Sequence, residues 1–109
     1  MRVFDDLVEF SVDFLLSGKG NARQLTFHLA DGWPDRPALE LVFTLSVAAN
    51  SIEEVFSGAE SQEVAYDSWR MAGLVGVDLF MAQSLGVPHR SSADLTAYWR
   101  AYDPFFLTS

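Results

Sequence analysis

The segment 61–85 limits the folds open to this chain more than any other, because its second half is apolar on nearly every side. Ser61 can cap a helix there, and Gly86 marks its end. Such a helix has roughly 24 residues and a length on the order of 36 Å. Its first half has an ordinary polar face, whereas beyond Arg70 its only charged residue is Asp78. A helix that is apolar all round is buried, so the sequence predicts a packed helical core.

One strip of this helix can be either core or contact surface. Its members follow at heptad-like spacing, with one charged residue among four apolar ones: Met71, Leu74, Asp78, Met81 and Leu85. In the first interpretation the other helices surround the strip, and in the second it binds a second copy of the chain or one other protein. Four such side chains left in water would forgo very roughly 6–12 kcal/mol, at about 1.5–3 kcal/mol each. Methionine suits a surface that repacks against a partner, and a self-complementary helix face produces a symmetric dimer.

The rest of the chain is expected to add four helices. Residues 3–16 place apolar and acidic side chains at helical spacing, and Gly18 can end that helix in the left-handed conformation. Polar residues stand where their side chains can cap the N-termini of the other three: Asn21, Asp35 and Ser91. The connections are short, so we expect one all-α domain over residues 1–109, a compact bundle of about five helices with a long central one.

The segment of about 23–47 leaves a second fold open. Apolar and polar residues alternate with period two from Arg23 to Leu29 and again from Leu39 to Val47, which is a strand signal. These runs could pair as a hairpin and make the domain α+β. An apolar stripe at three- and four-residue steps continues for five turns through the second run, so we favour helices and keep the hairpin as the alternative.

Gly73 and Gly76 make one side of the long helix thin. A glycine inside a soluble helix costs about 1 kcal/mol relative to alanine, so its presence needs a structural reason. We expect another helix, or the indole of Trp33 or Trp99, to approach the backbone there. The alternative is a cavity for a small ligand, which requires polar groups that converge on it.

Asp78 is expected to differ from the surface acids. Burial would raise its pKa unless a cation pairs with it, and Arg36 or Arg100 could supply that cation. A structural salt bridge and a rim position at the contact surface both fit the sequence. A buried carboxylate of raised pKa is also a candidate site.

The N-terminal helix carries a row of acids on one face: Asp5, Asp6, Glu9 and Asp13. The chain has 15 acidic and 7 basic residues and a net charge of −8, which opposes direct binding of DNA or RNA. Such a row usually only solvates its helix. It could also imitate a row of phosphates and occupy the basic groove of a nucleic-acid-handling protein, with strongly salt-dependent binding.

Several classes of site have no basis in the sequence. The chain has no cysteine, and His28 and His89 do not form a His-x-x-x-His step, so we expect no metal and no cofactor. No catalytic motif is evident, and enzymatic activity is not indicated. The longest apolar run, 71–82, falls short of the about 20 residues that span a bilayer, and no secretory leader is evident. We therefore expect a cytoplasmic protein without a membrane-spanning helix.

These features predict a small acidic interaction protein, such as a regulator, adaptor or accessory subunit. It would bind itself, as a homodimer, or one protein partner through the apolar face of the helix at 61–85. Two alternatives stay open, an acidic decoy that uses the N-terminal row and a helical bundle that binds a small ligand.

Overall fold

The computed structural model describes the backbone of residues 2–107 and the side chains of residues 6–107. Its elements are five α-helices and one short 3-10 helix: α1 Arg2–Leu16, α2 Ala22–Gly32, α3 Leu39–Val55, α4 Ala59–Leu85, α5 Ser92–Ala101 and η1 Pro104–Leu107. Within residues 2–107 the sole β-type pairing is an isolated bridge between Pro37 and Ser91. The predicted all-α bundle with one long helix is confirmed, and the alternative hairpin at about 23–47 is wrong.

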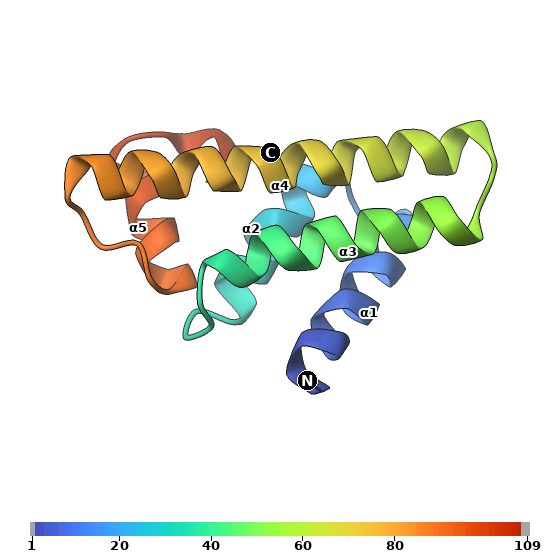
Figure 1. Cartoon of the computed structure of the whole chain (residues 1–109), viewed down its shortest axis with the longest axis horizontal. Helices are drawn as coiled ribbons and strands as arrows, with labels where there is room; N and C mark the ends of the chain where they lie inside the picture. The colour runs from blue at the N-terminus through green and yellow to red at the C-terminus, as the bar shows by residue number, and fades with distance from the viewer. Residues whose placement is uncertain (1, 108–109) are drawn as a thin grey trace.

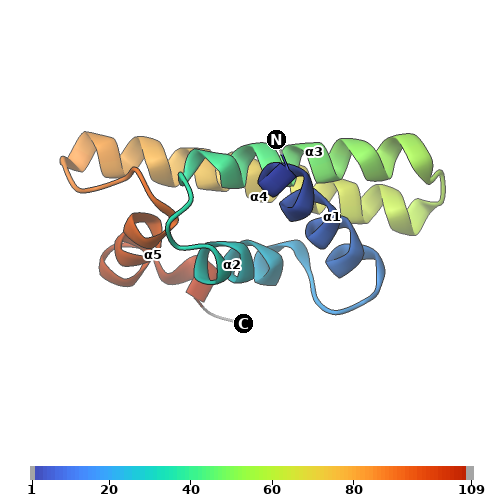
Figure 2. The ribbon, with the colours of Figure 1, turned by 90° about the horizontal axis from the view of Figure 1, so that it is seen from below.

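The helices form two layers (Figures 1 and 2). α3 and α4 run antiparallel as a helical hairpin that makes one layer, and α2 and α5 lie on one side of it. α1 crosses the edge of α3 obliquely and reaches from the level of this hairpin to the level of α2. The 27 residues of α4 span almost the whole 42 Å length of the molecule. The opposite side of the hairpin has no described helix over it.

The core is built where the hairpin meets the other layer. The buried residues of α3 recur at three- and four-residue steps: Leu41, Thr44, Leu45, Ala48, Ala49 and Ile52. The buried residues of α4 include several small ones: Ala65, Ser68, Met71, Ala72, Val75, Asp78 and Ala82. Ser68 Oγ donates a hydrogen bond of 2.8 Å to the carbonyl oxygen of Leu45, which joins the two helices inside the core.

Local capping signals set four of the helix ends as predicted. Asn21 and Ser91 are N-caps of α2 and α5, and each forms a capping box with the residue three positions later. Gly18 and Gly86 have φ of 76° and 75°, the left-handed conformation that glycine adopts at helix C-termini. The apolar segment after α5, which includes η1, packs onto the core, where Phe106 is buried against Trp99.

Two predicted N-caps, Asp35 and Ser61, are wrong, for a different reason in each helix. α3 begins at Leu39 rather than after Asp35. The backbone N–H of Ala38 donates to the carbonyl of Arg90, which fixes the segment before α3 against the start of α5. α4 begins two residues before Ser61, whose hydroxyl donates to the carbonyl of Gly58 instead of capping the helix.

The hydroxyl of Thr44 leads to a testable prediction. This side chain is 1% exposed, and its Oγ1 has no hydrogen-bond partner among the described residues. Valine has the same shape without the polar group, so Thr44→Val should raise the free energy of unfolding by about 1 kcal/mol. Urea unfolding measures the change, with Ser68→Ala as a control that should lower it by a similar amount. A loss of stability in Thr44→Val would show that the hydroxyl is satisfied.

Candidate functional site

The structure divides the predicted contact strip of α4 between core and surface. Met71 and Asp78 are 5% and 6% exposed, Leu74 packs half-buried against the core, and Met81 and Leu85 are exposed. Met71 and Asp78 therefore do not lie on a free surface. α4 contacts α1, α2 and α5 as well as α3, so it buries a wider arc than the single stripe that helical spacing predicts. Partner binding by the exposed members stays a prediction.

The larger apolar surface lies on the side of the hairpin away from α2 and α5. Its large side chains are all exposed: Leu39, Phe43 and Val47 of α3, and Trp69, Val77 and Phe80 of α4. We call these six residues, together with Gly73 and Gly76, the outer hairpin face. Phe80 is 65% exposed, Val77 55%, Leu39 53% and Phe43 52%. Aromatic and aliphatic side chains with this much exposure contribute little to the fold of the free chain.

The two helices contribute adjoining parts of the outer hairpin face. On α4 its members follow at steps of four, three and four residues: Trp69, Gly73, Gly76 and Phe80. These steps keep side chains on one side of a helix. Leu39 of α3 lines one shallow groove with Gly76 and Phe80. At the other end, the indole N–H of Trp69 donates to the Glu53 carboxylate of α3.

Gly73 and Gly76 form a notch in this face that nothing fills. A Cβ atom built on either residue would meet no atom within 4 Å among the described residues outside the helix itself. The expected approach of Trp33 or Trp99 is wrong. Trp33 lies against the ring of Phe10, with 5.4 Å between centroids, and Trp99 is fully buried. The notch is open to solvent rather than a closed cavity.

The outer hairpin face contains no charged residue, although the chain has a net charge of −8. Of the charged residues at its border, four form ion pairs, whereas Glu53 beside Trp69 and Arg90 beside Phe80 have none among the described residues. Arg36 forms an ion pair with Glu40, and Arg70 Nη1 lies 3.6 Å from Asp67 Oδ1. The face is therefore suited to an apolar contact.

Asp78 is the buried carboxylate of the core. Its Oδ2 accepts a hydrogen bond of 2.9 Å from the indole N–H of Trp99. Neither predicted arginine pairs with it in the described chain, because Arg36 pairs with Glu40 and Arg100 is exposed. Burial raises the pKa of Asp78 to about 6, the bond from Trp99 lowers it in part, and the negative charge of Asp103 raises it further. Asp78 is a structural group of raised pKa, away from the outer hairpin face.

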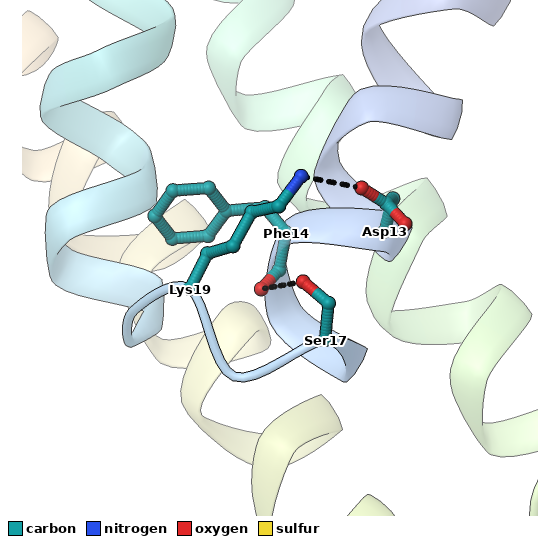
Figure 3. A network of polar contacts seen from close by, with 4 residues as sticks. All are labelled: Asp13, Phe14, Ser17 and Lys19. Carbon is teal, nitrogen blue, oxygen red and sulfur yellow. Dashed lines mark hydrogen bonds and ion pairs between the residues drawn. The ribbon is translucent and has the colours of Figure 1, made fainter.

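The acidic row of α1 is on the surface as predicted, as far as the structure describes it. Asp6, Glu9 and Asp13 are exposed, and the side chain of Asp5 lies outside the described residues. At the end of α1, Lys19 Nζ lies 2.9 Å from Asp13 Oδ2 (Figure 3). One acid of the row thus has a basic partner within the chain itself, in an exposed ion pair.

No family model, curated protein or solved structure matches the chain. Among the described residues, no cluster of three or more histidine, aspartate or glutamate side chains could hold a metal ion. None of the described helices combines the length and apolar character needed to cross a membrane. The chemistry of the outer hairpin face is therefore the basis for a functional proposal.

Proposed function

We propose that this chain is a non-enzymatic interaction module that docks one protein partner on the outer hairpin face. The observation that carries the proposal is the exposure of six large apolar side chains on α3 and α4, of which Leu39 and Phe80 line one groove together with Gly76. An apolar patch of this kind on a soluble domain marks an interaction site. A regulator, adaptor or accessory subunit in the cytoplasm would use such a face.

The arrangement of the two layers supports this role. α3 and α4 are held against the other helices by their buried stripes, so the outer hairpin face lies on two packed helices rather than on loops. Helices of this kind present their side chains in a fixed arrangement, which lowers the entropy cost of binding. Phe43, Trp69 and Phe80 also belong to the residue types that dominate binding energy at protein interfaces.

The two alternative functions have less support. The acidic decoy would use the row on α1, in which Asp13 already forms an ion pair with Lys19. The ligand-binding bundle would need an enclosed pocket with converging polar groups. Near Gly76 the structure has an open groove, in which His89 and Arg90 border one end.

A photo-crosslinking amino acid at position 80 tests the proposal in the cells that make the protein. We expect position 80 to crosslink to one defined protein, because its side chain lies within the docking surface. The matched control is position 55, since Val55 is 72% exposed at the far end of α3 and outside the outer hairpin face. Gly76→Leu should abolish the crosslink at position 80 by filling the notch. Identical crosslinking at positions 80 and 55 would contradict the proposal.

A further inference from the structure

We infer that the occupant of the outer hairpin face is a second copy of this chain, docked with α4 antiparallel to α4 around a twofold axis level with the midpoint of Gly73 and Gly76. The inference rests on the proposed function and names its partner. Four observations carry it: the order of large and small residues along α4, the open notch, the extent of the face and its charge.

The order of residues along α4 is symmetric about that midpoint. Trp69 lies as many residues before the midpoint as Phe80 lies after it, and the same holds for Gly73 and Gly76. In an antiparallel pair of α4 helices centred there, Trp69 comes level with Phe80 of the second copy. Gly73 then comes level with Gly76 of the second copy. A twofold interface requires a surface that complements itself. The order large, small, small, large is the same in both directions along the helix, so it meets this requirement.

The notch explains why glycine stands at the centre. The distance between packed helices is set by the side chains at their contact and is about 8–10 Å. Glycine at both central levels lets the two backbones approach closely, so the aromatic side chains on either side can pack across the interface. Inside one chain nothing uses this space, because a Cβ at either glycine meets no described atom within 4 Å. A second α4 would fill it.

The same twofold axis brings only the first turns of α3 against α3 of the second copy, because Leu39 lies beside Gly76 and Phe80, close to the axis, and the rest of α3 runs away from it. Leu39 and, one turn further on, Phe43 are then covered together with the members on α4, whereas Val47 lies beyond the start of the second copy's α3. The parts that overlap are about 33 Å of α4 and about 10 Å of α3, and at a width of about 10 Å they cover roughly 430 Å². Stable interfaces bury about 600–1,000 Å² per partner and weak, transient ones bury less, so the extent fits a weak, reversible pair.

The charge distribution favours a copy over a basic partner. Two chains of net charge −8 repel unless their contact surface is neutral. The outer hairpin face contains no charged residue, and two acids at its border, Glu40 and Asp67, are paired with arginines of the same chain. Glu53 at the Trp69 end and Arg90 at the Phe80 end are opposite in charge, and an antiparallel pair brings these two ends to the same level. A partner selected for positive charge would instead be expected to bind at exposed acids such as Asp6 and Glu9.

Thiol crosslinking tests the antiparallel arrangement directly, because the chain has no cysteine of its own. Tyr66 and Gln83 are both exposed, and they are also symmetric about the midpoint of Gly73 and Gly76. They lie about 26 Å apart along one helix, at 1.5 Å per residue. A mixture of Tyr66→Cys and Gln83→Cys chains should be joined by a short bis-maleimide. Either variant alone should not be crosslinked, because the thiols of its two copies lie at opposite ends of the interface.

Each other outcome overturns the inference in a distinct way. Crosslinking of either variant alone would show a parallel pair. No crosslink in the mixture, with a solution mass of 12.1 kDa at all concentrations, would exclude the second copy. In that case the proposed function survives if the photo-crosslinker at position 80 captures another protein, and fails if it captures none.

Gly76→Leu separates docking from folding. The position has open space around it, so leucine fits the free chain and improves the helix. We expect the melting temperature of Gly76→Leu to equal or exceed that of the wild type. When Gly76→Leu is introduced into both the Tyr66→Cys and the Gln83→Cys chain, the mixture of the two should no longer crosslink. The control is Ala97→Leu, which adds an apolar side chain at an exposed position of α5 and should leave the crosslink unchanged. A folded Gly76→Leu chain that still crosslinks would contradict the close contact at the notch.

Discussion

Replacing Asp78 with asparagine should raise the free energy of unfolding at pH 8 by up to about 3 kcal/mol, because a tenfold change in the acid dissociation constant corresponds to about 1.4 kcal/mol. The pKa of Asp78 rises from 3.8 to about 6 in the folded chain, mainly because its carboxylate is buried. Asparagine keeps an oxygen that can accept the hydrogen bond from Trp99. It removes the buried charge, which no described cation compensates.

The sign of the pH dependence follows from the raised pKa. Between about pH 4 and 6 the folded chain holds a proton on Asp78 that the unfolded chain has already released. The stability due to that proton is fully present below pH 3.8 and is lost as the pH rises through about 6. The difference in stability between Asp78→Asn and the wild type should therefore grow over this range and level off above it.

Urea unfolding from pH 4 to 8 measures this difference. Asp31→Asn is the matched control, because Asp31 is exposed on α2 and its replacement should change stability by no more than about 0.5 kcal/mol. Equal stability of Asp78→Asn and the wild type at pH 8 would show that the buried charge is compensated.

Phe80→Asp should weaken association through the outer hairpin face by about 2–4 kcal/mol, or roughly 30- to 1,000-fold, which is the range of interface hot spots. The charge would lie opposite Trp69 of the second copy, where it has no partner. Phe80 is 65% exposed in the free chain, so the melting temperature should stay close to that of the wild type. Sedimentation over a range of concentrations gives the dissociation constant.

Val55→Asp is the control for this experiment, since it adds the same charge at a more exposed position outside the face. It should leave association unchanged. A large fall in the melting temperature of Phe80→Asp would mean that this side chain belongs to the core. Unchanged association in a folded variant would remove Phe80 from the interface.

The helix ends that could be predicted from the sequence are those that depend on local bonds. Asn21 bonds to the backbone N–H three residues on, and glycine at positions 18 and 86 adopts a conformation that other residues avoid. The start of α3 could not be predicted from Asp35, because the bond from Ala38 to Arg90 joins segments far apart in the sequence. Local patterns contain no information about such a pairing.

The surface of α4 could be predicted only in part, because its second half is apolar all round. Spacing alone does not tell which side faces the other layer, so it places Met71 on the same strip as Met81, although only Met81 is exposed. The sequence does indicate that Trp69 and Phe80 flank the core stripe. Their exposure depends on α3, which covers one side of α4 and leaves the adjoining side open. The partner of Asp78 could not be predicted, because the bonded indole lies on α5.

The labelling rate of a single thiol shows whether the outer hairpin face is covered where the protein works. Val77→Cys introduces the only thiol of the chain in the middle of the face, and Val55→Cys places one outside it. In intact cells the thiol of Val77→Cys should react with a maleimide more slowly than that of Val55→Cys, and adding Phe80→Asp should remove the difference. Equal rates for the two thiols in cells, with Phe80 intact, would contradict a docked partner.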